Sequence, residues 1–425
     1  MRRPWLLLIV GACALSACSG GDTQVATDAP SVTSASGGDG SIDLSVIGPT
    51  TTTTTLPPTT TSTTTTTEPP TTTTAPRRWT LMAGGDVLMD RSELAGIDPF
   101  AGMVPQLASA DLAFVNVEMA ITTRGTPVNK TFVFRAPESA ADTIASAGVD
   151  VVSLANNHAR DFGEVGLLDT LDALEAVGVA SVGAGAVDTD AYRHVVLQVP
   201  DGPRVAFVAA SQIMPSGFGA GADRAGIANA TAQRERVLAN VRVAADDADV
   251  VVVSVHWGIE RDTCPSNVQR SFAQDLLDAG ATAVLGHHPH VLQPVVTTDT
   301  QLVAYSLGNF IWHARFGITG DTGILQLDFE ESALIGWRFH PHVLDAAGAP
   351  VPISEGSRHE RIVDIISGDC AKHDPPPVTT APLTTTTTAP PAPTTTSPTT
   401  TAAPITTTTM PVTTTTEASG PDTSG

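Results

Sequence analysis

Basic residues are scarce in this chain. Its 425 residues include 22 Lys and Arg against 44 Asp and Glu, which gives a formal net charge of −22 at pH 7. Domains that bind nucleic acid usually present a basic surface, so we expect no nucleic-acid partner. The negative charge also repels anionic lipid headgroups, so attachment to a membrane would need a lipid anchor. A strongly anionic substrate would need a metal ion or a local group of arginines to hold it.

Cysteine is nearly absent as well, with four in the chain. Cys13 and Cys18 lie near the N-terminus, which leaves Cys264 and Cys370. Outside the cytoplasm two such thiols often pair. A bridge would close a loop of about 106 residues and contribute ~4.7 kcal/mol in the chain-entropy model. Two buried free thiols are the alternative, and the sequence leaves both open.

The N-terminus lacks an apolar run long enough to cross a membrane. Arg2 and Arg3 precede the short apolar run Leu6 to Val10, and Leu15-Ser16-Ala17-Cys18 follows. This pattern predicts a secretory signal peptide over residues 1–17. Its last residues are typical of a bacterial lipobox, in which Cys18 is lipidated; ordinary cleavage with Cys18 as a spare thiol is the alternative. We therefore expect an exported protein that is lipid-anchored to the outer face of the cell membrane. Each buried CH₂ of the acyl chains would contribute ~0.8 kcal/mol to this anchoring.

Two stretches lack the apolar residues that folding requires. Residues 18–76 and 375–425 are rich in Thr, Pro and Ser, and neither contains a His or a Trp. Such segments cannot bury enough apolar area to offset the entropy of ordering, so we expect a disordered or semi-extended linker and tail. The linker would span ~45 Å as a coil and up to ~180 Å in a polyproline-like form.

Residues 77–374, between these stretches, have the composition of a globular domain and contain all 11 histidines. Strand and helix patterns alternate along it, which favours an α/β fold with mostly parallel pairing. The later strands, and a hairpin at Pro200-Asp201-Gly202, favour antiparallel pairing. We predict two packed β-sheets flanked by helices. The expected strands are 79–83, 112–117, 131–134, 149–154, 192–199, 204–210, 250–255, 281–285, 302–306, 323–329 and 335–342, and the expected helices are 137–147, 164–177, 231–245 and 268–279.

Six short segments of this domain carry polar groups that can bind metal, and most of them directly follow an apolar stretch. Ligands of open α/β sheets usually bind at the carboxyl ends of strands, and carboxylate, amide and imidazole groups there suit a divalent metal. The segments are Gly84-Gly85-Asp86, Asn116-Val117-Glu118, Asn156-Asn157-His158, His256-Trp257-Gly258, Gly286-His287-His288-Pro289-His290 and Ser306-Leu307-Gly308-Asn309.

These segments, in this order and spacing, resemble the CapA family, the bacterial capsule-synthesis proteins associated with poly-γ-glutamate. The resemblance covers about residues 79–345. It implies a sandwich like that of the calcineurin-like metallophosphoesterases. Those enzymes open with an Asp-x-His pair, and Asp86 and Leu88 stand in its place here, so one imidazole is missing. Two alternatives therefore stay open: a binuclear centre with two tightly bound ions, or one tightly bound ion beside one that is weakly bound.

The expected ligands of one or two divalent ions (Mn, Mg, Zn or Fe) share carboxylate, amide or imidazole chemistry. His288 and His290 are expected on one face of an extended segment, because side chains alternate there, with His287 pointing the other way. Asp86 as a turn cap and His256 as a core histidine are the alternatives. The full set is Asp86, Glu118, Asn157, His256, His288 and His290.

Five further residues are expected around the metal. His158 would give a proton to the leaving oxygen, and Asp161 would orient ligand imidazoles. Arg91 and Arg135 are candidates for binding an anionic substrate, although solvated arginines are common. Asn309 would contact the substrate or shape a loop beside the site.

The resemblance and these residues together predict a surface-anchored, metal-dependent hydrolase, phosphoesterase-like, linked to capsule or envelope polymer metabolism. Metal would lower the pKa of a water molecule toward ~7 and polarise the substrate oxygen. The substrate would be an anionic envelope polymer, a phosphoester or a γ-glutamyl bond, and a capsule-synthesis complex is a further possible partner. The alternative is a non-catalytic assembly or anchoring factor that holds the polyanion through its metal site.

Overall fold

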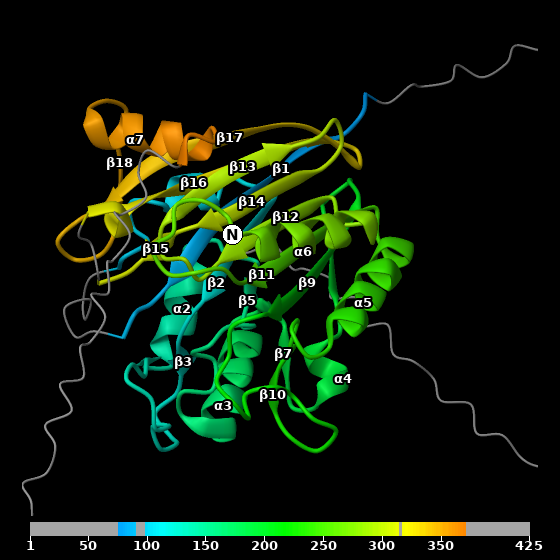
Figure 1. Ribbon diagram of the computed structural model, residues 1–425, viewed down its shortest axis with the longest axis vertical. Coiled ribbons are helices and arrows are strands. Elements are labelled where there is room, and N and C mark those ends of the chain that lie inside the picture. Colours follow the sequence, from blue (N-terminus) through cyan, green and yellow to red (C-terminus); the bar gives the residue numbers. More distant parts are fainter. Residues whose placement is uncertain (1–74, 91–97, 314–316, 371–425) are drawn as a thin grey trace, which may run out of the picture. The chain divides into compact units, whose positions relative to one another are not determined.

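The computed structural model describes residues 75–90, 98–313 and 317–370 (Figure 1). The expected signal peptide, Cys18, most of the linker, Arg91 and the C-terminal tail lie outside the described residues. None of the helices in the described ranges is both long and apolar enough to cross a membrane.

The first sheet has a parallel half and an antiparallel half. Its strand order is β18-β17-β16-β1-β2-β5-β6, and β15 (Asn309–Ile311) pairs with the end of β1. The strands β1 (Arg78–Val87), β2 (Leu112–Val117), β5 (Val151–Ser153) and β6 (Ala180–Val182) are parallel. The strands β16 (Asp321–Glu330), β17 (Ala333–Leu344) and β18 (Pro350–Pro352) add in antiparallel pairing.

The second sheet has a parallel centre and antiparallel edges. Its order is β13-β14-β12-β11-β9-β8. The central strands β9 (Arg204–Ser211), β11 (Val250–His256), β12 (Ala283–His287) and β14 (Leu302–Leu307) are parallel, whereas β8 (Val195–Gln198) and β13 (Leu292–Thr297) are antiparallel. Every residue of β11 is buried, which is why its sequence is a nearly continuous run of valine.

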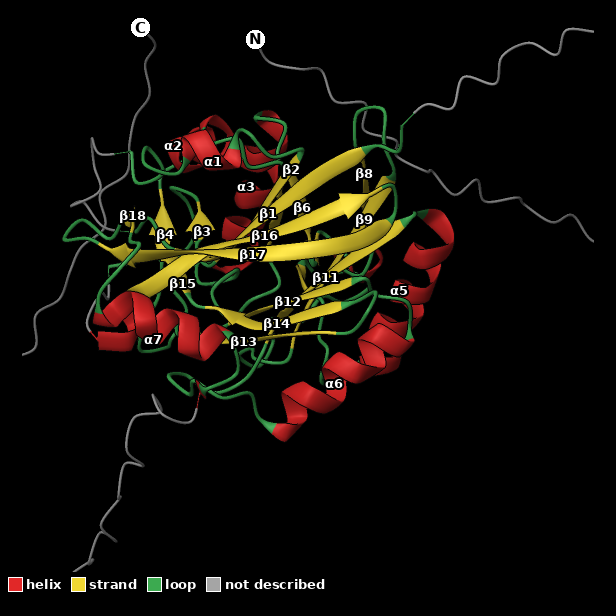
Figure 2. Ribbon diagram, turned by 90° about the horizontal axis from the view of Figure 1, so that it is seen from above, coloured by secondary structure: helices red, strands yellow, loops and turns green. Residues whose placement is uncertain are grey.

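The two sheets pack face to face, with helices on the outside (Figure 2). Phe114 of β2 stacks on Phe207 of β9 in the core between the sheets, with ring centres 6.2 Å apart. The outer face of the first sheet is covered by α1 (Val104–Leu107), α2 (Ser139–Ser146) and α3 (Gly163–Ala176), and that of the second by α5 (Arg234–Asp247) and α6 (Asn267–Asp278). The predicted two-sheet α/β architecture is confirmed.

Short elements complete the fold. The helix α7 (Ser357–Ile366) inserts Ile362, Ile365 and Ile366 into the core between the sheets. The remaining elements are β3 (Ala120–Ile121), β4 (Arg135–Ala136), β7 (Ala184–Gly185), α4 (Asp188–Ala191), β10 (Gly226–Ile227) and the 3₁₀ turn Gly317–Gly320.

The strand expected over residues 131–134 is wrong. Pairing begins only at β4, which pairs with β3. The backbone N–H of Phe134 donates to the side chain of Asp161 at 2.7 Å, and Phe132 is 66% exposed. The alternating pattern therefore reflects a loop that touches the candidate site on one side, not a strand.

Candidate metal centre

The six predicted segments meet at one edge of the sandwich, because the parallel strands of both sheets end there. Asp86 lies near the end of β1 and Glu118 follows β2. Register pairing places Asp86 beside Asn116, and His256 of β11 beside His287 of β12. The glycine before Asp86 is required, because a Cβ on Gly85 would lie 2.0 Å from the carbonyl oxygen of Gly308.

Asp86 is fully buried and held from several directions. Its Oδ1 accepts a hydrogen bond from Asn116 Nδ2 at 2.9 Å and lies 3.3 Å from His287 Nδ1. Its Oδ2 lies 3.2 Å from His290 Nδ1 and accepts from the backbone N–H of His288 at 3.3 Å. Burial acts to raise the pKa of Asp86, but hydrogen bonds and charge from the two imidazoles outweigh it and hold that pKa well below its usual range.

Glu118 is also fully buried, and neither of its carboxylate oxygens has a hydrogen-bond partner among the described residues. Burial, and then the charge of Asp86, raise the pKa of Glu118 well above its usual range. Its Oε1 lies 3.5 Å from His256 Nε2 and 3.8 Å from His290 Nε2. An unpaired buried carboxylate is costly, so this position calls for a cation.

Two sets of possible metal ligands share Glu118. One set is Glu118, His288 and His290, and the other is Asp86, Glu118 and His256; within each set the ligand atoms lie within 4.8 Å of one another. Asn157 Oδ1 lies 2.9 Å from His256 Nε2 and adds a neutral oxygen. The fold therefore brings the predicted ligands together, and the carboxylate of Glu118 belongs to both sets.

The buried atoms without partners fit a metal. Besides both oxygens of Glu118, they include Nδ1 of His256 and Nδ1 of His288. Burial, and then the charge of His290, lower the pKa of His288 to about 3, so this ring is neutral at pH 7 and can act as a ligand. Oxygen and imidazole donors in this mixture suit Mn²⁺, Fe²⁺ or Zn²⁺.

The strand alternation predicted for His288 and His290 is wrong, although the two rings do lie together. The strand β12 ends at His287, and His288 and His290 have φ angles of 94° and 57°, in the left-handed region. A bend, and not strand alternation, brings the two ring centres to 5.8 Å. Strained backbone of this kind gathers at functional sites. His287, expected to point away, instead directs Nδ1 at Asp86.

His158 and Asp161, which were predicted in separate roles, are in contact. His158 Nδ1 lies 2.7 Å from Asp161 Oδ2, and both residues are buried. Burial lowers the pKa of His158, and hydrogen bonding to Asp161 opposes this only in part. The ring of Phe134 stacks on His158 at 4.2 Å between centres. The imidazole is therefore fixed through Nδ1, which leaves Nε2 for chemistry.

Lys130 completes this group, and no pattern in the sequence pointed to it. Its Nζ donates to the carbonyl oxygen of Asn157 at 2.6 Å and lies 2.6 Å from Asp161 Oδ1. It also lies 3.1 Å from His158 Nδ1. Because that nitrogen donates its proton to Asp161, we interpret the last approach as a contact and not a hydrogen bond.

Of the three predicted substrate-binding residues, Asn309 contacts the candidate site and Arg135, among the described residues, does not. Asn309 holds the candidate ligand His290: its Oδ1 lies 3.0 Å from His290 Nδ1 and its Nδ2 donates to the carbonyl of His290 at 3.2 Å, which directs Nε2 toward Glu118. Arg135 is exposed, and its guanidinium lies 4.6 Å from the centre of the Phe162 ring. In the described part of the chain no contact joins Arg135 to the candidate ligands. Arg91 lies outside the described residues.

Two asparagines of the predicted segments, Asn116 and Asn156, had no predicted role. Asn156 Nδ2 donates to the carbonyl oxygen of Val117 at 2.7 Å, and Asn156 Oδ1 accepts from the backbone N–H of His158 at 3.0 Å. Together with the bond from Asn116 to Asp86, these contacts connect the loops after β1, β2 and β5. Their position at or directly after the strand ends was the available signal.

A disulfide joins Cys264 to Cys370. It connects the loop between β11 and α6 to the residues after α7. Thr263 Oγ1 donates to the carbonyl oxygen of Cys370 at 2.8 Å beside it.

Residues 80–314 match the model of the bacterial capsule synthesis protein family PGA_cap. The chain belongs to this family. The resemblance to CapA proteins found in the sequence is thereby confirmed. The chain is 29% identical over 288 residues to the PGA biosynthesis protein CapA of Bacillus subtilis, covering 66% of this chain and 75% of that one. It is 29% identical over 307 residues to the capsule biosynthesis protein CapA of Bacillus anthracis, covering 69% of this chain and 74% of that one.

Among solved structures, the chain is similar to TT1561 of Thermus thermophilus, with a TM-score of 0.34 and 9% identity. That likeness covers 60% of this chain and 99% of the other. The fold assignment for this CapA-family chain rests on its own strand pairing.

Proposed function

We propose that this CapA-family chain is a metal-dependent hydrolase of capsule or cell-envelope polymer, whose target is a γ-glutamyl bond of poly-γ-glutamate or a phosphoester of another envelope polymer. The observation that carries the proposal is Glu118, a buried carboxylate without a hydrogen-bond partner among the described residues, shared by two ligand sets. Bound divalent ions would supply Lewis acidity and a water molecule of lowered pKa.

The residues of the chain supply positioning and proton transfer. Asp86, Glu118, Asn157, His256, His288 and His290 would hold the ions. Asp161 accepts from Nδ1 of His158 and fixes the ring, so Nε2 would give a proton to the leaving oxygen from the doubly protonated ring and would accept one in the neutral ring. Asn309 and Asn116 keep His290 and Asp86 oriented.

The proposal includes export and a lipid anchor at Cys18. The basic start, the short apolar run and the Leu15-Ser16-Ala17-Cys18 segment support it. We expect the chain to fractionate with the cell membrane and Cys18→Ser to release it; a membrane-bound Cys18→Ser variant would contradict the anchor.

Two substitutions test the metal-dependent activity in the purified full chain. Glu118→Gln removes the shared charge, and we expect bound Mn²⁺, measured by elemental analysis, to fall by at least half. Glu235→Gln, at an exposed position in the first turn of α5, is the matched control. His158→Ala should keep the metal but lower hydrolysis of bis-p-nitrophenyl phosphate by about 10²- to 10⁴-fold.

The results separate the two functions considered. Metal-dependent turnover that disappears with His158→Ala supports the hydrolase. Tight metal binding without turnover of any phosphoester or γ-glutamyl substrate would contradict it and assign the metal site to holding the polymer. Full metal content in Glu118→Gln would contradict the proposed centre itself.

A further inference from the structure

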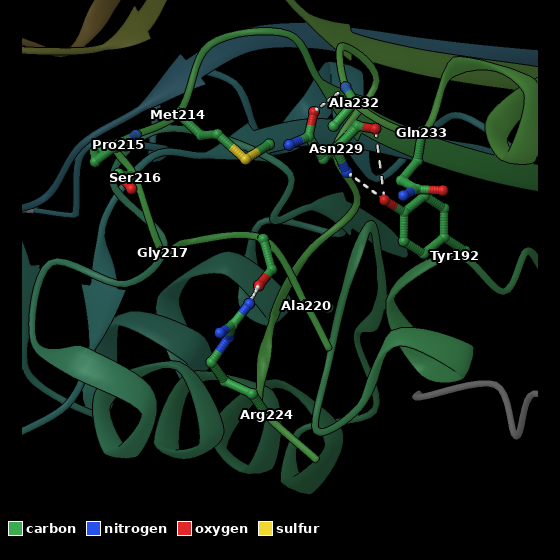
Figure 3. Close-up of a pocket in the computed structure, with 11 residues that line it drawn as sticks. Tyr192, Met214, Pro215, Ser216, Gly217, Ala220, Arg224, Asn229, Ala232 and Gln233 are labelled. Carbon is green, nitrogen blue, oxygen red and sulfur yellow. Dashed lines mark hydrogen bonds between the residues drawn. The ribbon is translucent and has the colours of Figure 1, made fainter. Parts of the chain in front are cut away.

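A cavity lies beside the candidate metal centre, behind residues 214–219, which we call the wall segment. Its volume is ≈ 360 Å³, within the usual range of small-molecule pockets. Figure 3 shows Met214, Ser216 and Gly217 of the wall segment on one side, and Tyr192, Asn229 and Gln233 on another. Arg224 closes a further side.

The wall segment separates this cavity from the candidate site. Just before it, the backbone N–H of Gln212 donates to the carbonyl oxygen of the ligand residue His256 at 2.9 Å. The ring of Phe218, in the wall, lies 5.6 Å from Lys130 Nζ. The guanidinium of Arg160 donates to the carbonyl oxygen of Gly217. The wall segment thus faces Lys130 through Phe218 on one side and lines the cavity with its other five residues on the other.

Two of the residues that line the cavity, Asn229 and Arg224, offer hydrogen-bond donors. Asn229 Oδ1 accepts from the backbone N–H groups of Thr231 and Ala232 at 2.9 and 2.8 Å, so its Nδ2 is left to face the cavity. Arg224 uses Nε and Nη2 on the carbonyl of Gly219, at 3.3 and 3.0 Å. Gln233 precedes the first residue of α5, so the positive end of that helix dipole lies at the same place.

Among the described residues, no carboxylate lines this cavity, although the chain has 44 acidic residues. Two nearby carboxylates are already paired: Asp188 with Arg236 at 2.8 Å and Glu164 with Arg160 at 3.0 Å. Asp223, next to Arg224 in sequence, is exposed and is not part of the lining. In an acidic chain, a cavity that carries Arg224 and has no carboxylate in its lining offers an anion a place where the general repulsion is locally reversed.

We infer that this cavity binds a carboxylate carried on an acidic polymer chain, next to the metal centre. A γ-linked glutamate chain presents one such carboxylate on every unit, so one unit can occupy the cavity while the chain passes the wall segment. The inference deepens the proposed function by naming the ligand chemistry, but binding in the cavity does not require a metal ion.

The test measures binding of γ-linked penta-glutamate to the full chain by calorimetry, in chelator and at low salt. Arg224→Gln should weaken binding about tenfold, ~1.4 kcal/mol, because a charge-assisted hydrogen bond is lost. Gly219→Leu should weaken it at least as much by filling the cavity: a Cβ there would lie 3.9 Å from both Met214 Sδ and Asn229 Nδ2, with no backbone clash. Arg242→Gln, which removes the same charge from an exposed position on α5, is the matched control and should bind like the wild type.

Each other result overturns the inference. Equal binding by wild type, Arg224→Gln and Gly219→Leu, with thermal unfolding unchanged, would place the polymer elsewhere. Binding that appears only when Mn²⁺ is restored would place it on the metal centre. Binding of inorganic phosphate, but not of penta-glutamate, that depends on Arg224 would show a different anion site. Because the chelator removes metal, failure of the hydrolase proposal leaves this measurement valid.

Discussion

Lys130 places an ammonium group against the pair formed by His158 and Asp161. The carboxylate of Asp161 is fully buried, and Lys130 Nζ, 2.6 Å from its Oδ1, is its cationic partner. The same Nζ holds the carbonyl oxygen of Asn157, a candidate metal ligand. Lys130 is therefore a positioning residue that acts on both halves of the site.

Replacing this lysine should separate turnover from metal binding. We expect Lys130→Met to keep its metal, because among the six candidate ligands Lys130 contacts only Asn157, through its backbone carbonyl, and to lower kcat on bis-p-nitrophenyl phosphate about tenfold. Lys130→Arg should recover part of that loss, since a guanidinium can still pair with Asp161. The checks are steady-state kinetics and metal content. An unchanged kcat in correctly folded Lys130→Met would show that the contact is only structural.

The residues of the site differ in how far sequence can find them. Asp86, Glu118 and His256 each stand at the end of a strand that has a clear apolar pattern, so their meeting at one edge follows from parallel pairing. Lys130 lies in an irregular loop, where no periodicity relates it to His158. The left-handed backbone at His288 and His290 depends on packing around the strand end and has no signature in these residue types.

Asp150 binds three strands together where the chain enters β5. Its Oδ2 accepts from the backbone N–H of Ala113 on β2 at 2.8 Å, and its carbonyl accepts from Ala180 on β6 at 2.9 Å. Burial is the main effect on this carboxyl and raises its pKa from 3.8 to about 7, against the hydrogen bond from Ala113. The junction of these strands is thus built around a group that titrates near neutral pH.

This raised pKa makes stability depend on pH. Between about pH 4 and 7 the folded state holds a proton that the unfolded state has released, so stability falls as pH rises through that window. Asp150→Asn keeps an acceptor for Ala113 and removes the charge. We expect it to unfold at least ~2 °C above wild type at pH 8, from a gain of about 1 kcal/mol or more, with the difference shrinking toward pH 4.

Asp172→Asn, an exposed change of equal charge on α3, should show no such trend in thermal scans across pH. A constant offset at all pH values would contradict the assignment.

Like the site residues, some strands could be predicted from the sequence and others could not. The central strands β9, β11 and β12 are buried on both faces, and their ranges were predicted to within about two residues from pattern alone. The edge strand β18 contains two prolines and three residues in all, and the pairs β3 with β4 and β7 with β10 have two residues a side. Strands this short form because the surrounding structure places a pairing strand beside them, so their local sequence does not specify them.

At the scale of the whole described domain, the disulfide connects parts far apart in sequence. Cys264 and Cys370 are 106 residues apart, and the segment between them contains β12, β14, β16 and β17. The loop that carries Cys264 also bonds to the metal segment, because the backbone N–H of Arg261 donates to the carbonyl of Pro289 at 2.8 Å. Pro289 lies between His288 and His290, so the bridge supports the loop against which these ligands are placed.

Removing the bridge should therefore reduce both stability and metal affinity. Closing a loop of about 100 residues is worth ~4.7 kcal/mol in the chain-entropy model, and natural bridges typically contribute about 2–5 kcal/mol. We expect the double variant Cys264→Ser/Cys370→Ser to lose about 3–5 kcal/mol in urea unfolding, and chemical reduction of the wild type to cause the same loss. Reduction should leave the double variant unchanged, which controls for other effects of the reagent. Metal titration of the double variant should show weaker binding, since the Arg261–Pro289 bond then depends on a loop with one fewer constraint. A loss of less than about 1 kcal/mol in the free energy of unfolding, with unaltered metal affinity, would contradict this role of the disulfide. Packing of Ile362, Ile365 and Ile366 of α7 in the core between the sheets would then be enough to hold this end of the domain in place.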